Sequence, residues 1–386
     1  MPFKHFIYLT ISMLLLFCSC IEEYRPNISS KESDLYVIAG KITNESGFHS
    51  IFVAKSSNPE DPSRIPVSNC MVTIYDDNDN YFEAEEYHGG EYKVYIDDSY
   101  LALGTAFKAE IITPEGDILS SSYDTLRFCP PIDSIYYIIQ NFLTTDPEVT
   151  NPGLQFYLDY NGIGTFTKRI KIDIEETWQI ESKYPIRWVW HGSYLDYLIP
   201  PDVSKKVCWK TEKNEDIYLM KTDDFTDNIY KNFALHHVLN TSEKLVFGYS
   251  ILITQLSISN STFDYYKKVQ ANILTDKGLY ETQPQLVEGN IINLSNGSER
   301  VLGYFYTAGV DKKRIFIGLM PDFINFIPVC KPEPLWYDYT YRTDIDTMYL
   351  WLDPDKYAPL GYILTKGCVD CTSRGGSTTK PDFWPN

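Results

Sequence analysis

Short runs in which apolar and polar residues alternate dominate the sequence, and this pattern restricts the chain to a mainly β fold. Val94 and Ile96 fall on the face opposite their charged neighbours, as expected for a half-buried strand. The run from Val72 to Tyr75 reads in the same way. Residues 107–113 and 117–122 flank a Pro-Glu-Gly sequence, which is a hairpin signal. The pattern predicts several antiparallel strands before residue 127.

These strands divide the chain into two predicted domains. About seven of them within residues 34–127 predict an N-terminal β-sandwich that resembles transthyretin-like or Ig-like modules. The sequence Cys129-Pro130-Pro131 marks the boundary, because neither proline can donate to a strand ladder. Residues 128–386 are expected to form a larger β-rich domain with one short helix and a cysteine-containing C-terminal tail.

Within the second domain, the strongest strand signals are two alternating apolar rows. They are Phe156, Leu158 and Tyr160, and Ile170, Ile172 and Ile174. Residues 249–259 and 314–319 are further strand predictions. The helix is predicted near residues 261–272, where Ser261 and Asp264 form a pair like a capping box.

The N-terminus predicts export. Lys4 and His5 precede an apolar run from Ile7 to Phe17 that is too short to span a bilayer, so residues 1–19 are interpreted as a signal peptide. The sequence Phe17-Cys18-Ser19-Cys20 resembles a lipobox, and Cys20 is therefore the predicted site of lipidation. Its acyl chains, at about 0.8 kcal/mol per buried methylene, would tether the protein to membrane lipid. The alternative is an ordinary secretory signal that contains two cysteines.

Residues 20–33 are polar and lack periodicity, so they predict a flexible linker. Glu22 and Glu23 directly follow Cys20. Acidic residues here resemble the signal that sends Bacteroidota lipoproteins to the outer face of the outer membrane, and the alternative is a solvated linker. The predicted location is thus the outer membrane, lipid-anchored and facing the cell exterior.

The charge balance excludes one class of partner. The chain has 52 acidic and 34 basic residues, a net charge of −18. Nucleic-acid binding requires a basic face, so no nucleic-acid partner is expected.

An ordered set of motifs indicates a family. It comprises Gln283-Pro284-Gln285, Val287-Glu288-Gly289-Asn290-Ile291, Val301-Leu302-Gly303-Tyr304-Phe305 and, in the tail, Lys380-Pro381-Asp382-Phe383-Trp384. Together these motifs resemble the domain-of-unknown-function 4249 family of Bacteroidota outer-membrane lipoproteins. The resemblance implies a surface or outer-membrane lipoprotein, often encoded beside TonB-dependent transporters. It implies no established activity, ligand or catalytic residue.

Four cysteines near or in the tail are structural disulfide candidates: Cys208, Cys330, Cys368 and Cys371. A single Cys-x-x-Cys pair cannot complete a four-cysteine zinc site. The glycines and proline that follow it disfavour the helix start of a redox pair. The prediction is a disulfide within the pair, or one to Cys330 or Cys208, that fixes the tail.

No catalytic residue, metal site or cofactor is predicted. His236 and His237 are adjacent, and adjacent side chains of a strand point to opposite faces. The acidic run from Asp76 to Asp79 lacks the spacing of an EF-hand loop, so a hairpin turn is favoured over a calcium site. The sequence contains no established catalytic motif.

Two groups of aromatic residues suggest binding surfaces. Pro381, Phe383 and Trp384 lie at the end of the chain, where large rings need a cover, either the protein's own second domain or a partner. Trp188, Trp190 and Trp209 cluster in sequence around a Pro-rich loop, Ile199-Pro200-Pro201, and could stack on a glycan.

Three functions follow from these observations. The favoured hypothesis is a non-enzymatic accessory lipoprotein that binds a TonB-dependent barrel and assists nutrient capture or envelope assembly. A second is a stand-alone glycan-binding surface protein. The third is a hydrolase whose carboxylates are placed by the fold.

Overall fold

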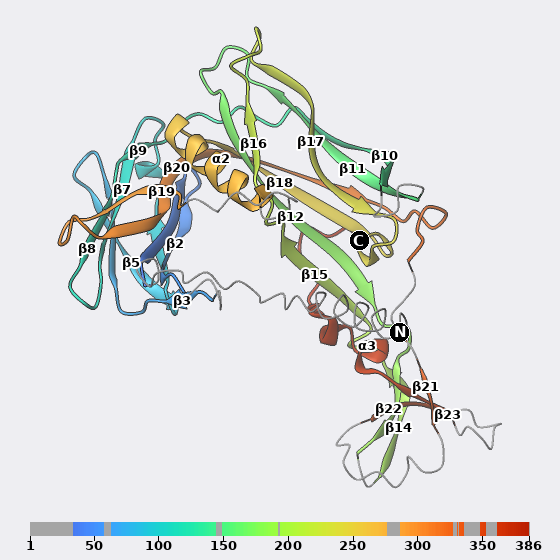
Figure 1. Cartoon of the computed structure of the whole chain (residues 1–386). Helices are drawn as coiled ribbons and strands as arrows, with labels where there is room; N and C mark the ends of the chain where they lie inside the picture. The colour runs from blue at the N-terminus through green and yellow to red at the C-terminus, as the bar shows by residue number, and fades with distance from the viewer. Residues whose placement is uncertain are drawn as a thin grey trace, which may run out of the picture.

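The chain is mainly β, as the alternating pattern predicts. The computed structural model (Figure 1) describes residues 34–57, 63–143, 149–191, 194–275, 286–326, 330, 332–335, 348–352 and 361–385. The predicted signal peptide and linker, with Cys20, Glu22 and Glu23, lie outside this part. Within it, no helix is long and apolar enough to cross a membrane.

Nine strands form a closed, barrel-like sheet, here called the ring. Its order is β1-β2-β6-β5-β4-β7-β8-β19-β20, and β20 then pairs with β1 in parallel. The strands are β1 (Tyr36–Thr43), β2 (Gly47–Lys55), β4 (Met71–Asp76), β5 (Tyr81–His88), β6 (Glu91–Ile96), β7 (Ala106–Ile112), β8 (Ile118–Ser121), β19 (Glu288–Asn293) and β20 (Arg300–Ile317). Two short strands, β3 (Ile65–Pro66) and β9 (Asp124–Thr125), pair with β2 and β7.

The ring differs from the expected sandwich over residues 34–127, because two of its strands come from the far side of the Cys129-Pro130-Pro131 boundary. Ile291, Val301 and Phe305 belong to the same buried core as the N-terminal strands. Within residues 34–127, β1 pairs only with β2, and β8 only with β7. Both would therefore be edge strands, and β19 and β20 remove these edges by pairing with them.

Two glycines make this closure sterically feasible. A Cβ on Gly303 would lie 1.9 Å from the carbonyl oxygen of Ile38, and one on Gly289 would lie 1.7 Å from the carbonyl oxygen of Gly303. Gly303 also has a positive φ of 92°, which favours glycine. The backbones of β1, β20 and β19 therefore approach too closely for any side chain at these two positions.

The second half of β20 leaves the ring and enters a β-sandwich. It pairs with β18 (Tyr249–Ser257), which pairs with β12 (Arg169–Glu181), and β12 also pairs with β15 (Val207–Lys213) and β16 (Tyr218–Lys221). A second sheet contains β10 (Ser134–Leu143), β11 (Thr150–Asn161) and β17 (Ile229–Leu239). The strand predicted at 314–319 thus exists but begins much earlier, at Arg300.

The core between these sheets contains both predicted apolar rows. Phe156, Leu158 and Tyr160 of β11 share one buried cluster with the isoleucine row of β12. Burial of these large side chains contributes about 1.5–3 kcal/mol each. β20 therefore links two hydrophobic cores through one continuous strand.

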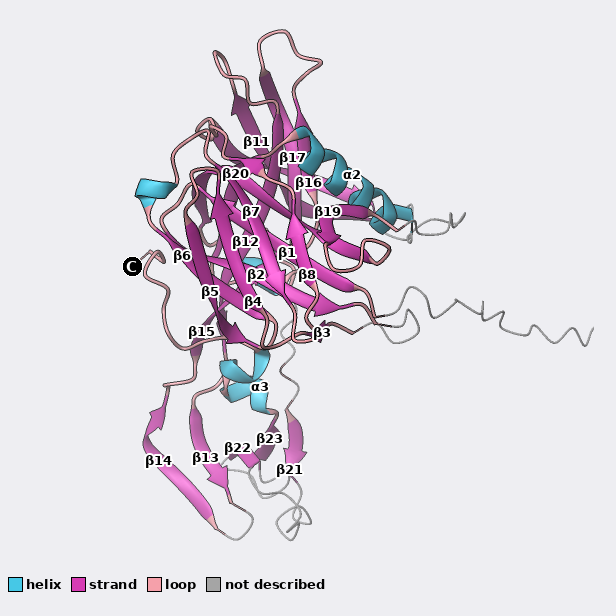
Figure 2. Cartoon of the chain, turned by 90° about the vertical axis from the view of Figure 1, so that its left-hand side faces the viewer, coloured by secondary structure: helices cyan, strands magenta, loops and turns pink. Residues whose placement is uncertain are grey.

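A smaller sheet, here called the distal sheet, extends from the sandwich (Figures 1 and 2). Its order is β14 (Leu195–Asp202), β13 (Ile186–Trp190), β22 (Met348–Leu352), β23 (Gly361–Leu364) and β21 (Glu333–Leu335). The expected Pro-rich loop is wrong, because Ile199, Pro200 and Pro201 lie within β14. This strand is at the edge of the sheet, where prolines are tolerated because the missing N–H groups need no partner.

The predicted helix is α2 (Asn260–Thr275). Its cap is Ser259 rather than Ser261, since the Ser259 hydroxyl accepts the Thr262 N–H at 3.1 Å. Phe263 packs in a buried cluster with Tyr304 and Tyr306 of β20, which holds α2 beside the junction of the ring and the sandwich.

The closure of the ring predicts a large effect of Gly303→Ala. The added Cβ would meet the Ile38 carbonyl, so the free energy of unfolding should fall by about 2–4 kcal/mol in urea denaturation. The control is Gly297→Ala, where a Cβ has no neighbour within 4 Å and the change should stay within about 0.5 kcal/mol. Equal stability of the two variants would contradict the steric role of Gly303.

The ring also predicts acid sensitivity through His49, which is buried on β2. Burial lowers the pKa of His49 to about 4, from 6.5. Between these values the unfolded chain binds a proton that the folded chain does not, so stability is lost as pH falls, by at most about 3 kcal/mol. His49→Gln should therefore flatten the stability profile above about pH 5, where carboxylates contribute little. An unchanged slope in the variant would refute this assignment.

Candidate binding surface

Two disulfides join the tail to the sandwich and the distal sheet. They are Cys208–Cys371 and Cys330–Cys368. Cys371 and Cys368 are thus linked to Cys208 and Cys330, respectively, and not to each other. Cys368 is buried in the core of the distal sheet, with Ile186, Val189 and Leu364. The tail consequently fixes the base of the distal sheet.

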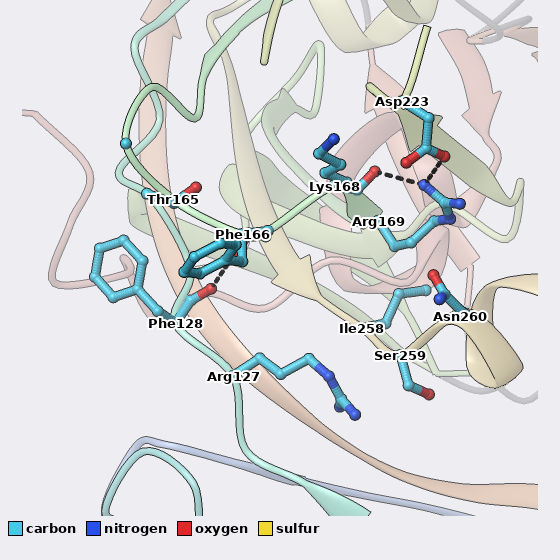
Figure 3. A pocket seen from close by; sticks show the side chains of 12 residues that line it. Arg127, Phe128, Thr165, Phe166, Lys168, Arg169, Asp223, Ile258, Ser259 and Asn260 are labelled. Atoms are coloured by element: carbon cyan, nitrogen blue, oxygen red, sulfur yellow. Dashed lines mark hydrogen bonds and ion pairs between the residues drawn. The ribbon is translucent and has the colours of Figure 1, made fainter. Parts of the chain in front are cut away.

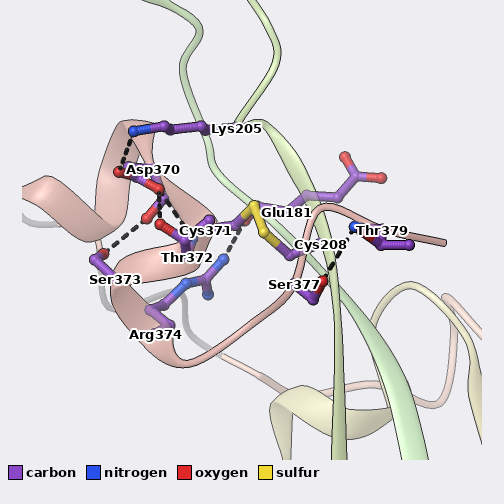
Figure 4. Close-up of a disulfide and its surroundings, with 10 residues drawn as sticks. All are labelled: Glu181, Lys205, Cys208, Asp370, Cys371, Thr372, Ser373, Arg374, Ser377 and Thr379. Carbon is purple, nitrogen blue, oxygen red and sulfur yellow. Dashed lines mark hydrogen bonds and ion pairs between the residues drawn. A yellow bond between two sulfur atoms is a disulfide. The ribbon is translucent and has the colours of Figure 1, made fainter. Parts of the chain in front are cut away.

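Polar contacts surround the Cys208–Cys371 disulfide (Figure 4). Asp370 accepts the Thr372 N–H at 3.0 Å and lies 3.3 Å from the ammonium of Lys205. Burial opposes ionisation of Asp370, but these partners outweigh it and lower the pKa of its carboxyl. Arg374 donates to the Glu181 carbonyl at 2.6 Å. Charge-assisted hydrogen bonds therefore hold the turn that carries Cys371.

The terminal aromatic residues pack on the chain itself. Trp384 is only 9% exposed and meets the ring of Phe316 edge-on, with centroids 5.9 Å apart. Phe383 is 41% exposed and lies under the guanidinium of Arg314 at 3.6 Å. Pro381 is half-buried, and its carbonyl accepts the Trp384 N–H. Of the two alternatives for the tail, the structure shows docking on the chain's own second unit.

The three predicted stacking tryptophans do not form one strip. Trp188 and Trp190 lie on one face of β13, whereas Trp209 lies on β15 of a different sheet and exchanges backbone hydrogen bonds with Ser377 of the tail. All three side chains are half-buried. Their proximity in sequence is misleading because the chain passes from one sheet to another between β14 and β15.

One face of the distal sheet is nevertheless apolar and partly open. Leu195, Tyr197 and Ile199 alternate along edge strand β14 and are 40%, 48% and 76% exposed. Tyr197 is directly opposite Trp188, and their rings stack with centroids 4.1 Å apart. Together, Trp188, Trp190, Leu195, Tyr197 and Ile199 are called the distal apolar face. Such a face on an edge strand is typical of a docking surface.

A buried polar cluster in the sandwich was not predicted. Glu176 accepts hydrogen bonds from Tyr249 at 2.7 Å and Lys244 at 2.8 Å, and lies 3.2 Å from Nε2 of His236. Burial raises the pKa of Glu176, but these partners lower it to about 2. The sequence offers one indication of this cluster, because Glu176 continues the buried isoleucine row of β12. Because three partners hold the buried carboxylate, the cluster stabilises the core.

The described residues contain no group of three side chains suited to a metal ion. His237 stacks on Phe142, and its ring centroid is 6.0 Å from that of His236. Asp76 accepts the N–H groups of Asn78 and Asn80, so the acidic run forms the hairpin turn between β4 and β5.

These features define a strand-built protein with a closed ring, a sandwich and a disulfide-linked distal sheet. A sequence comparison matches residues 21–314 to the family described as "Domain of unknown function (DUF4249)". The chain therefore belongs to this family. A comparison with curated proteins finds no match.

The packing of the tail predicts that its two aromatic side chains contribute unequally to stability. Trp384→Ala should lower the free energy of unfolding by about 3 kcal/mol, because it leaves a cavity against Phe316. Phe383→Ala should cost about 1 kcal/mol, since this ring is half-exposed and loses mainly its contact with Arg314. Thermal unfolding of both variants tests this, and equal stability of Trp384→Ala and the wild type would contradict the docked tail.

Proposed function

We propose that the protein is a lipid-anchored, non-enzymatic accessory protein of the outer membrane that docks on a TonB-dependent barrel. Cys20 would provide the membrane tether, and Glu22 and Glu23 would direct the chain to the cell exterior. The distal apolar face would contact the partner. The N-terminal sequence and the family resemblance support the proposed anchor, location and partner, and the exposed apolar face supports the proposed docking surface.

The distal apolar face is the observation that carries this proposal. It places Ile199, Tyr197 and Leu195 on the open edge of a sheet whose base is fixed by two disulfides. A rigid apolar surface loses little conformational freedom on binding, so more of its burial contributes to affinity. A chain with net charge −18 that docks through an uncharged face also avoids desolvating its carboxylates.

The N-terminal unit supports a surface role. We interpret residues 34–127 as a relative of transthyretin-like or Ig-like modules that has gained two closing strands. The support is its antiparallel hairpins around one core.

Glycan binding is the second candidate. Tyr197 on β14 and Tyr194 just before it are 48% and 56% exposed, and open aromatic rings are suited to stacking. This alternative predicts that the purified protein binds polysaccharides without any barrel.

A matched pair of variants tests the docking face. Ile199→Asp places a charge on the distal apolar face, where Ile199 is 76% exposed. The control Phe48→Asp places a charge on the ring, where Phe48 is 72% exposed. In affinity purification from solubilised outer membranes, Ile199→Asp should lower barrel recovery about tenfold, because the charge must be desolvated on docking. Phe48→Asp should leave it unchanged. Equal recovery with both variants, or no barrel with the wild type, would overturn the proposal.

A further inference from the structure

A cavity of about 760 Å³ lies where the ring, the sandwich and α2 meet. Three segments supply its walls: residues 127–128 after β9, the loop 164–169 before and into β12, and residues 258–260 at the start of α2. Asp223, which follows β16, completes the lining. Neither the accessory function nor the distal apolar face uses this site.

The lining is basic in an acidic protein. Arg127, Lys168 and Arg169 line the cavity, against a single carboxylate, that of Asp223. The whole chain has the opposite balance, 34 basic against 52 acidic residues. A local excess of cations raises the concentration of anions at such a site.

Both arginines have donors to spare. Arg127 uses Nη1 for Asp124 at 2.9 Å and for the Thr125 carbonyl at 2.6 Å. Arg169 also uses Nη1, for Asp223 and for the Lys168 carbonyl at 3.3 Å. Each guanidinium carries five N–H donors in a planar fork that matches a carboxylate or a phosphate. Within the described residues, no hydrogen bond is made by Nε or Nη2 of either arginine.

The cavity also has an apolar side (Figure 3). The two arginines lie on opposite sides of the opening, with Ile258 between them, and Phe166 lies beside Phe128 at one margin. Phe166 is fully exposed and Phe128 is 48% exposed. An exposed phenylalanine contributes nothing to the core, but it offers a ring face to a bound molecule.

We propose that this cavity binds a small organic anion. Its carboxylate or phosphate group accepts hydrogen bonds from the free donors of Arg169, and its apolar group contacts Ile258 and Phe166. Arg127, on the other side of Ile258, adds positive charge to the cavity. A few polar donors beside apolar surface are the usual composition of a small-molecule site. Asp223 keeps Arg169 in place through its ion pair and leaves the rest of the fork available.

Three probes test the charge requirement: 4-phenylbutyrate, phenyl phosphate and the neutral 4-phenylbutanol. In calorimetric titration of the purified protein, at least one anion should bind as one molecule per chain and about tenfold more tightly than the alcohol. The carboxylate and the phosphate probe distinguish the two sources of negative charge. Absence of binding by both anions, or equal affinity for the alcohol, would overturn the proposal.

Two variants with matched controls locate the site. Phe166→Ala and Arg169→Gln should each weaken binding of the anion about tenfold. Phe48→Ala removes a largely exposed phenylalanine that lies on β2, outside the cavity. Arg169 is ion-paired to Asp223 and lies over the ring of Phe263. Arg314→Gln removes an arginine in the same kind of setting, ion-paired to Glu175 and over the ring of Phe383, but outside the cavity. The controls should bind like the wild type. The melting temperature of Phe166→Ala should equal that of the wild type, so that weaker binding cannot be attributed to unfolding. Wild-type affinity in both cavity variants would refute the site.

Discussion

The parallel pairing of β1 with β20 is the contact on which the rest of the architecture depends. It closes the ring, and it places β20 so that the same strand continues into the sandwich. Without it, β1 would present an unpaired edge and the ring would lose Val301 and Phe305 from its core. The two cores are therefore coupled through the backbone of one strand and not through a linker.

This contact gives a physical reason for two of the family-like motifs. Gly303 of Val301-Leu302-Gly303-Tyr304-Phe305 faces the Ile38 carbonyl, and Gly289 of Val287-Glu288-Gly289-Asn290-Ile291 faces the Gly303 carbonyl. Their neighbour Asn290 accepts the Phe305 N–H at 3.0 Å and donates to the Phe305 carbonyl at 2.7 Å. Both motifs are thus explained by strand closure. The terminal motif is explained in the same way by packing, since its Trp384 is buried on Phe316.

Local structure could be predicted from the sequence, whereas long-range pairing could not. The strands around Val72, Val94, Phe156 and Ile172, and the helix near Ser261, follow from periodicity alone, because burial of one face imposes a period of two or of 3.6 residues. Ring closure and the Cys208–Cys371 disulfide join residues far apart in sequence, and no local pattern encodes such a partner. Trp188 and Trp190 indicate part of the distal apolar face, but Pro200 and Pro201 predict a loop where the structure has strand β14, which carries Ile199.

The cavity and the buried Glu176 cluster show a second limit. Arg127 and the segment with Phe166 and Arg169 meet only through the fold, so no pattern in the sequence connects them. The position of Glu176 could have been predicted as a buried polar site, because its carboxylate falls in a row of otherwise apolar residues.

The most direct test of ring closure is to express residues 34–127 alone and follow their unfolding by circular dichroism and amide NMR. Because β19 and β20 supply part of the core and cover both edges, the fragment should show no cooperative transition and little amide dispersion. A fragment that unfolds cooperatively with well-dispersed resonances would contradict the account, since the N-terminal unit would then be complete without the pairing of β1 and β20.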